Sequence, residues 1–447
     1  MIEPDQHEPR PSVKRPRADA DAEVNLSPIQ LLSEWPYAVA AGLDKLNRLR
    51  LHKLLMRGMI FYTDYSGCEC PCEALLKALT ALMREEGWRF DKPALRWLRT
   101  CDHGALQTAL LVRSAKAEEA ETGKAPCHFS SILDRLPAWT RAWIEAATPP
   151  EDSSRDAKAV AYADIRRFIM KHRNVIFDEK ATSWCVVHER RCPVAPLPRG
   201  TQPRPPLRCT VGGWTCVAWS TLGKSEGRSH ESDIPLSVWL GERRAWAEQG
   251  AEEVWFGECV PNFDVQAIVN ELDSTHDIKW LHDDPEAHGW PIKRKRLVVA
   301  GLSRGKVQWV GPEDYQDDYK RRFHRATMTS GDALFCASDA DRNEMYKTMA
   351  QMQGHHMSIE SIASLPPEDL LTKIFPPGVL QRLQEYSKFR RVNCPDDVFI
   401  ADLDQGIHRG GSCGKPWPAL LTHGWVMNLA GDGSFKLATG MEQMAER

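Results

Sequence analysis

Several features are missing from this sequence, and each absence removes a class of protein. No apolar run approaches the roughly 20 residues of a membrane-spanning helix, and no apolar stretch follows the charged N-terminal residues. Neither a membrane protein nor a secretory signal is therefore predicted. The chain has no internal repeat and no long low-complexity tract. Its formal net charge is only −3, so it is not a uniformly basic nucleic-acid coat, and contact with DNA or RNA requires local basic patches.

Paired cysteine motifs are also missing, although the chain holds 13 cysteines. An odd, scattered set without a secretion signal predicts reduced thiols in the nucleus or cytoplasm. A zinc module is the alternative for residues 68–72, which include three cysteines, and for Cys185, His188 and Cys192. Neither group forms a paired C-x-x-C pattern, and one-residue spacing suits a tetrahedral site poorly. We therefore predict no metal site.

The composition that remains is that of a globular protein. The 447 residues are 42% hydrophobic and 27% charged, enough for two or three domains, and most of the 16 tryptophans are expected in the core. Residues 1–25 are polar and predict a disordered tail. Their cluster of Lys14, Arg15 and Arg17 is either a nuclear localisation signal or a solvated tail. A nuclear location is the expectation, with a cytoplasmic one as the alternative.

Short apolar runs that alternate with helical patterns predict the fold. The run 59–62 ends in a glycine turn and is followed by a helical pattern, which is how an α/β nucleotide-binding fold begins. Further strand-like runs lie at 209–211, 254–256 and 297–300. We predict an α/β fold with a doubly wound, mostly parallel sheet and a second, smaller domain.

The expected domain boundaries follow from changes in composition. We predict a catalytic-type domain over 26–305, a smaller domain over 306–417, and a return of 418–447 to the first domain. Residues 145–206 are an insertion, with a helix at about 158–173.

Three segments at strand ends carry side chains suited to chemistry. Gly212-Gly213-Trp214-Thr215-Cys216 follows one strand, and its two glycines allow a sharp turn and a close approach to a ligand. Glu258 follows the next strand, and residues 293–296 are four consecutive cations next to a third. Taken singly, a structural cysteine, a surface carboxylate and a solvated basic loop are equally ordinary interpretations.

The order and spacing of these segments resemble the cytosine-5 DNA methyltransferase family. In that family a Gly-Gly-Pro-Pro-Cys-Gln loop supplies a nucleophile, a Glu-Asn-Val segment an acid, and a Gln-x-Arg-x-Arg segment binds substrate and backbone. The resemblance implies a Rossmann-like methyltransferase fold with a target-recognition-like second domain. It also implies methyl transfer to cytosine C5 in DNA, with Cys216 as nucleophile, Glu258 as acid, and Arg294 and Arg296 as substrate-binding residues.

The cofactor implied by the resemblance is S-adenosyl-L-methionine. Tyr65-Ser66-Gly67 is similar to the family's first motif, which cradles the methionine part. Asp102 falls where the family has an acidic residue for the ribose hydroxyls. Residues 420–424 and 437–439 are similar to late motifs of the family.

The sequence departs from the family at several scaffold positions, and the family's closing Asn-Ala-Val-Pro helix has no counterpart before Arg447, so a shortened return segment is expected. The departures are Glu69 for the second glycine of the first motif, Trp214, Thr215 and Val217 around the cysteine, Cys259 for asparagine and Ile292 for glutamine.

Two further functions stay open at this point. One is a binding protein that keeps the fold without catalysis, and the other is a methyltransferase acting on RNA. The partner expected is DNA, with RNA as the alternative, and no membrane. The basic stretch 320–325 either contacts a nucleic acid or forms a solvated helix face.

Overall fold

The structure is a computed structural model of the chain. It describes residues 33–67, 70–89, 95–178, 180–196, 206–220, 223, 225–326, 329–394, 398–409, 413–419, 424–430, 432, 434–440 and 442. The basic cluster near the N-terminus, residues 68 and 69 of the first motif, and 420–423 of a predicted late motif lie outside these ranges. None of the described helices is long and apolar enough to span a bilayer.

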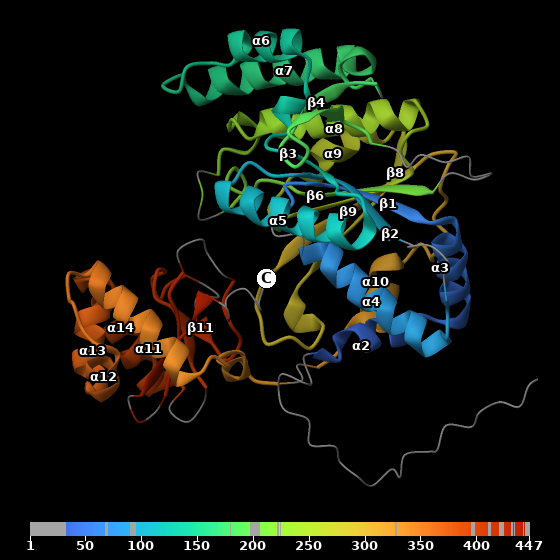
Figure 1. Ribbon diagram of the computed structural model, residues 1–447. Coiled ribbons are helices and arrows are strands. Elements are labelled where there is room, and N and C mark those ends of the chain that lie inside the picture. The colour runs from blue at the N-terminus through green and yellow to red at the C-terminus, as the bar shows by residue number, and fades with distance from the viewer. Residues whose placement is uncertain are drawn as a thin grey trace, which may run out of the picture.

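A seven-stranded sheet forms the centre of the larger domain, in the order β3-β2-β1-β6-β7-β9-β8 (Figure 1). All neighbours pair in parallel except β9, which is antiparallel to both β7 and β8. This is a mostly parallel, Rossmann-like arrangement, and the predicted α/β fold with a smaller second domain is confirmed. The strands are β1 (Met59–Asp64), β2 (Leu95–Cys101), β3 (Cys127–Phe129), β6 (Leu207–Gly213), β7 (Val254–Cys259), β8 (His276–Asp283) and β9 (Arg296–Ser303).

Helices cover both faces of the sheet because successive side chains of a buried strand point to opposite faces. On β1, Ile60 and Tyr62 join the core beneath α8, whereas Phe61 joins the core beneath α3 and α4. Figure 1 shows α8 and α9 on one face and α4 and α5 on the other. The helices of this domain are α2 (Trp35–Gly42), α3 (Lys45–Arg57), α4 (Cys70–Glu86), α5 (Ala105–Thr122), α6 (Ala138–Ala147), α7 (Arg155–Ile176), α8 (Asp233–Glu248), α9 (Val265–Leu272) and α10 (Tyr315–Phe323), with 3₁₀ turns η1 (Leu133–Arg135), η2 (Gly227–Ser229) and η3 (Pro285–Ala287).

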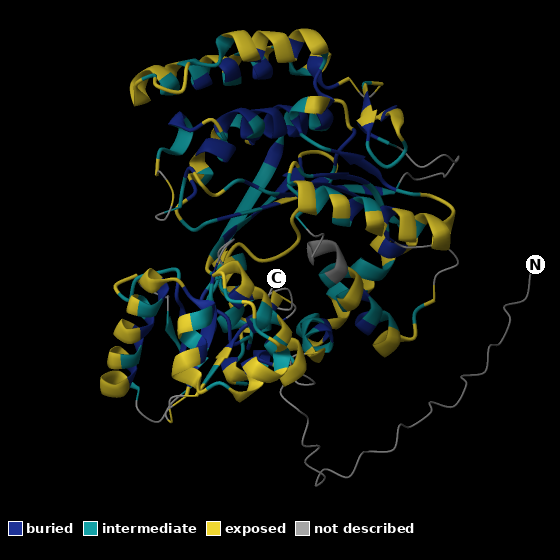
Figure 2. Ribbon diagram, turned by 60° about the vertical axis from the view of Figure 1, so that its left-hand side comes forward, coloured by how far each residue is buried: buried dark blue, intermediate teal, exposed yellow. Residues whose placement is uncertain are grey.

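The predicted insertion adds an outer layer to this domain. Its helix, predicted at about 158–173, is α7, and α6 and α7 lie over α8 on the side away from the sheet (Figure 1). A two-stranded hairpin follows, formed by β4 (Thr182–Cys185) and β5 (Arg190–Pro193). Figure 2 shows buried residues concentrated in the sheet and the adjacent helix layer, while the outermost helices are exposed on their outer side.

The second domain pairs a helical layer with a small antiparallel sheet in the order β11-β10-β12-β13. Its core includes Leu383, Phe399 and Met427, all buried. The elements are η4 (Gly331–Leu334), α11 (Asp339–Met352), α12 (Ile359–Ser364), α13 (Pro367–Ile374), α14 (Pro377–Asn393), β10 (Ile400–Asp402), β11 (Cys413–Gly414), β12 (Val426–Leu429) and β13 (Phe435–Leu437).

Two predicted boundaries are wrong. The described residues from 426 onward do not return to the large sheet, because β12 pairs with β10, and buried Glu442 forms a 2.9 Å ion pair with Arg342 of α11. The second domain also begins later than residue 306. Helix α10 belongs to the larger domain, where the hydroxyl of Tyr315 donates to the Trp280 carbonyl at 2.9 Å and that of Tyr319 to Asp283 at 2.7 Å.

A short backbone contact joins the two domains beside β9. The amide of Trp417 donates to the Pro291 carbonyl at 2.8 Å, and the amide of Lys293 donates to the Trp417 carbonyl at 2.8 Å. The Trp417 ring is fully buried, and its indole N–H donates to Gly331 at 2.7 Å. The second domain therefore holds the chain just before Arg294 and Arg296.

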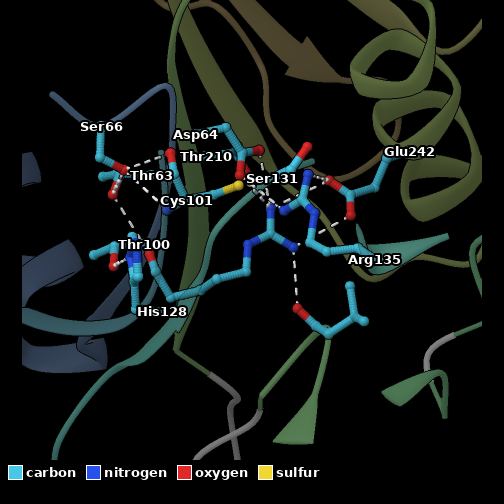
Figure 3. A network of polar contacts seen from close by, with 12 residues as sticks. Thr63, Asp64, Ser66, Thr100, Cys101, His128, Ser131, Arg135, Thr210 and Glu242 are labelled. Atoms are coloured by element: carbon cyan, nitrogen blue, oxygen red, sulfur yellow. Dashed lines mark hydrogen bonds and ion pairs between the residues drawn. The ribbon is translucent and has the colours of Figure 1, made fainter. Parts of the chain in front are cut away.

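A network of buried ions lies between the sheet and α8 (Figure 3). The carboxylate of Asp64 meets Arg99 at 3.0 Å and Arg135 at 2.8 Å, and Glu242 meets Arg99 at 3.2 Å. None of these side chains is more than 3% exposed. Arg243 extends the network by pairing with both Glu242 and Glu252. The network thus contains three guanidinium groups and three carboxylates, and charges buried to this extent must be paired.

Neutralising Glu242 tests how much this network contributes to stability. Burial alone would raise the pKa of Glu242, but the guanidinium groups of Arg135, Arg99 and Arg243 lower it to about 2. Because this folded-state pKa lies below the ordinary value of 4.5, the contribution is complete above pH 4.5 and is lost as the pH falls towards 2. We expect Glu242→Gln to lower the free energy of unfolding by about 3–5 kcal/mol at neutral pH.

The measurement is urea unfolding followed by tryptophan fluorescence at neutral and acidic pH. Glu248→Gln, at the end of the same helix, is the matched control. Its partners Arg173 and Arg244 are partly exposed, so the loss should stay below about 1 kcal/mol. Equal losses in the two variants would contradict a structural role for the network.

Candidate active site

The predicted site residues gather at one edge of the large sheet. Parallel strands end at the same edge, and β9 begins there because it runs in the opposite direction. Register places Asp64 opposite Gly212 and Gly213 opposite Glu258. Ligands of open α/β sheets bind at this carboxyl edge, next to the strand where the winding reverses.

The turn after β1 has an unusual backbone and an internal brace. Tyr65 and Gly67 have positive φ angles of 56° and 55°. The Ser66 hydroxyl is buried, lies 2.8 Å from the Thr63 hydroxyl, and accepts a 3.0 Å hydrogen bond from the Cys101 amide. These hydrogen bonds of the Ser66 side chain fix the shape of the turn that is predicted to contact the cofactor.

Asp102 joins this turn to the end of β2. One carboxylate oxygen accepts from the Gly67 amide at 2.8 Å and the other from the Gly104 amide at 2.9 Å. A carboxylate has about four lone-pair positions, so acceptor capacity remains for a diol. Sequence reasoning placed Asp102 at this edge but did not predict that it braces the neighbouring turn.

Close packing explains the first of the two glycines that end β6, whereas a Cβ at the second would make an ordinary contact. An added Cβ at Gly212 would lie 3.1 Å from the Trp239 indole nitrogen, and one at Gly213 would lie 3.4 Å from the Tyr65 carbonyl. The amide of Trp214 donates to the Glu258 carbonyl at 3.0 Å, and its ring stacks on Phe263 with centroids 5.2 Å apart. Packing of Trp214 therefore holds the loop in place.

Cys216 stands exposed at the start of the next turn. Its carbonyl accepts hydrogen bonds from the amides of Trp219 and Ser220 at 2.9 and 2.8 Å. The neighbouring Cys259 is buried, and its thiol donates to the Trp214 carbonyl at 3.7 Å. Burial raises the pKa of Cys259 to about 12, so Cys259 stays a neutral thiol. Of these two, only Cys216 is available to a ligand.

Glu258 and Arg296 form an ion pair beside this loop. Their Oε1 and Nε atoms are 2.6 Å apart, with 42% and 21% of the side chains exposed. Burial and the nearby charge of Arg294 lower the pKa of Arg296, while the negative forms of Glu258 and Cys216 oppose that shift. The four predicted catalytic and substrate-binding residues therefore lie within electrostatic reach of one another.

The basic stretch 320–325 is largely neutralised within the protein. Arg322 pairs with Asp318 at 2.8 Å and with Asp44 at 2.7 Å, and Lys320 lies 3.5 Å from Asp317. The Arg322–Asp44 pair attaches α10 to the start of α3, whereas the other two pairs lie within α10 and favour the solvated-helix interpretation.

Comparison with known proteins gives matches among solved structures only. No known family and no curated protein sequence matches this chain. The chain is similar to a DNA modification methyltransferase encoded within a prophage in E. coli, with 11% identity over 55% of this chain and 47% of that one and a TM-score of 0.25. It is also similar to DNMT2 of Spodoptera frugiperda (10% identity, 57% of this chain, 52% of that one, TM-score 0.26). Dnmt2 of S. pombe is similar as well (10% identity, 67% and 66%, TM-score 0.30).

The matched region spans about half the length of the first two of these structures. Likeness at such low identity concerns the fold alone, so the roles of the site residues are inferred from their geometry.

Thiol labelling tests which cysteine at this edge is accessible. With a maleimide at pH 8, we expect rapid labelling of Cys216 and of the exposed control Cys336 in the native protein. Cys259 should stay unlabelled, because it is buried and a thiol of pKa about 12 is ionised in only about one molecule in ten thousand at this pH. Peptide mass mapping before and after denaturation gives the sites. Labelling of Cys259 as fast as Cys216 would contradict the assignment.

Proposed function

We propose that this protein transfers a methyl group from S-adenosylmethionine to C5 of cytosine in DNA through a covalent adduct on Cys216. The observation that carries the proposal is the placement of an exposed cysteine beside the Glu258–Arg296 ion pair, at the carboxyl edge of a methyltransferase-type sheet. The backbone of Gly213 also lies against Tyr65 of the turn expected to hold the cofactor.

The chemistry explains why these residue types are needed. Cytosine C5 is a weak nucleophile until the Cys216 thiolate adds to C6, which forms a carbon–sulfur bond and moves electron density to C5. After methylation, loss of the C5 proton and departure of the thiolate restore the ring. Glu258 would hold the amino group and N3 of the base, and offset charge as the thiolate adds.

The cations would position the nucleic acid. Arg294 and Arg296 would bind a base oxygen or phosphate, since a guanidinium offers a fork of donors. A cytosine inside a duplex cannot reach a cysteine at a sheet edge, so the base would flip out of the stack. The contact of Trp417 with residues 291–293 supports a role for the second domain in placing these cations.

The cofactor fits the neighbouring part of the edge. An added Cβ at Gly67 would meet no atom within 4 Å, so the turn is open on that side. Asp102 supplies a carboxylate that suits the two ribose hydroxyls, and bound S-adenosylmethionine supplies an electrophilic methyl group. The chain's own contribution is to hold that group next to the loop of Cys216.

Changing Asp102 tests the cofactor assignment separately from catalysis. Asp102→Asn removes the charge and keeps an acceptor for one of the two backbone amides that Asp102 binds. We expect S-adenosylhomocysteine to bind about 10- to 100-fold more weakly, because hydrogen bonds to a charged group contribute about 1.5–3 kcal/mol. Isothermal titration calorimetry measures this, with Asp134→Asn as a control because Asp134 is half-exposed and pairs only loosely with Arg141, at 3.7 Å. Unchanged affinity would remove Asp102 from the cofactor site.

Covalent trapping tests the reaction itself. Fluorine at C5 cannot leave as a proton does, so an oligonucleotide with 5-fluorocytosine should stall the enzyme as a thioether adduct when the cofactor is present. We expect an adduct on DNA with the wild type and with Cys336→Ser, and none with Cys216→Ser, by denaturing gel and mass spectrometry. An adduct on RNA alone would contradict the DNA assignment. No adduct on either polymer, with the cofactor bound, would show a non-catalytic binding protein.

A further inference from the structure

We propose that Cys127, Cys185, His188 and Cys192 form a structural zinc site, separate from the candidate active site. The ligand atoms of these four residues all lie within 4.8 Å of one another. The Sγ atoms of Cys127, Cys185 and Cys192 lie 3.7, 3.2 and 3.5 Å, respectively, from Nδ1 of His188.

These distances match a single tetrahedral ion. With Zn–S near 2.3 Å and Zn–N near 2.0–2.1 Å, tetrahedral angles place each sulfur about 3.6 Å from the nitrogen. The three measured separations lie on either side of this value. Three thiolates and one imidazole are a usual donor set for structural zinc, and four protein ligands leave no open position for a substrate.

The ligands come from two parts of the chain that the fold brings together. Cys127 begins the edge strand β3, whereas Cys185, His188 and Cys192 lie on the β4–β5 hairpin. The hairpin leans on β3 through a 2.9 Å hydrogen bond from the Val186 amide to the His128 carbonyl. The sequence spacing C-x-x-H-x-x-x-C contains only three ligands, and the fourth lies far upstream, which is why no metal site was predicted.

Burial supports a metal over free thiols. Cys127, Cys185 and Cys192 are 6%, 0% and 5% exposed, and all three are free of disulfides. Three buried thiols around one imidazole nitrogen cannot all donate to it, because a neutral ring nitrogen accepts a single hydrogen bond. A metal ion would bind all four groups at once.

The position of the site indicates what the ion would do. A two-stranded hairpin is marginally stable by itself, and this one has few buried residues of its own. The chain that leaves it supplies the Val194 carbonyl to Arg99 at 3.0 Å and the Pro196 carbonyl to Tyr62 at 2.8 Å. The ion would therefore fasten the insertion to the sheet edge and hold these acceptors against the buried ion network. The zinc site is separate from the candidate active site, because the edge strand β3 is three strand spacings, about 14 Å, from β6.

Metal analysis of the full chain, purified under reducing conditions without added metal, tests the site. We expect about one zinc per chain by inductively coupled plasma mass spectrometry. Cobalt exchange should give the visible and near-ultraviolet bands of a tetrahedral thiolate site. Apoprotein whose cysteines all titrate with a thiol reagent, a disulfide within the cluster, or iron in place of zinc would overturn the proposal.

Substitutions locate the ion. His188→Ala should lose zinc and lower the melting temperature, whereas His188→Cys should retain zinc, because it restores four ligands. Cys336→Ser, outside the cluster, should keep the wild-type zinc content. Retention of full zinc by a soluble His188→Ala and Cys185→Ser double variant would place the metal elsewhere and refute the site. None of these measurements requires cofactor or nucleic acid, so they stand apart from the proposed methyl transfer.

Discussion

The pairing of Asp64 with Arg99 and Arg135 beneath the sheet edge is the constraint on which the rest of the larger domain depends. Removing ions from water costs several kcal/mol each, and that cost is offset only when every partner is in place. The network therefore favours one arrangement of β1, β2, η1 and α8 over others that would leave a charge unpaired. A hydrophobic core alone tolerates more alternatives, because apolar contacts have no fixed direction.

The ion network is linked to the candidate site by the peptide bond between Asp64 and Tyr65. Asp64 is the last residue of β1, and Tyr65 is the first residue of the following turn. The carbonyl of Tyr65 lies against Gly213. From Gly213 the chain passes through buried Trp214 to exposed Cys216, so an exposed side chain follows directly on buried neighbours. Asp102 braces the same turn from β2. Stiff support of this kind is what catalysis needs, since the reacting groups must be held in place before the substrate arrives.

Two additions are attached to the central sheet. The second domain is joined beside β9 by the backbone of Trp417, next to the cations of residues 293–296. The inserted hairpin is joined at β3 by the cysteine and histidine cluster, and it lends a carbonyl to Arg99. Both attachments lie close to groups that shape the site edge, although neither supplies the exposed cysteine. A change at either attachment would therefore act on the site through position.

Local sequence pattern determined the type of fold and the edge at which the candidate residues meet. Apolar runs alternate with helical segments, and residues that follow parallel strands must share an edge, so Cys216, Glu258 and Arg296 could be brought together from the sequence. Tertiary structure alone decided which distant segments pair. Nothing in the sequence near Cys127 indicates that the β4–β5 hairpin lies beside it, and nothing near residue 426 indicates that β12 pairs with β10. Arginine is usually found at the surface, yet Arg99 is fully buried. Periodicity reports only which face of an element is buried, whereas partners are selected by long-range complementarity of shape and charge, which no short stretch of sequence contains.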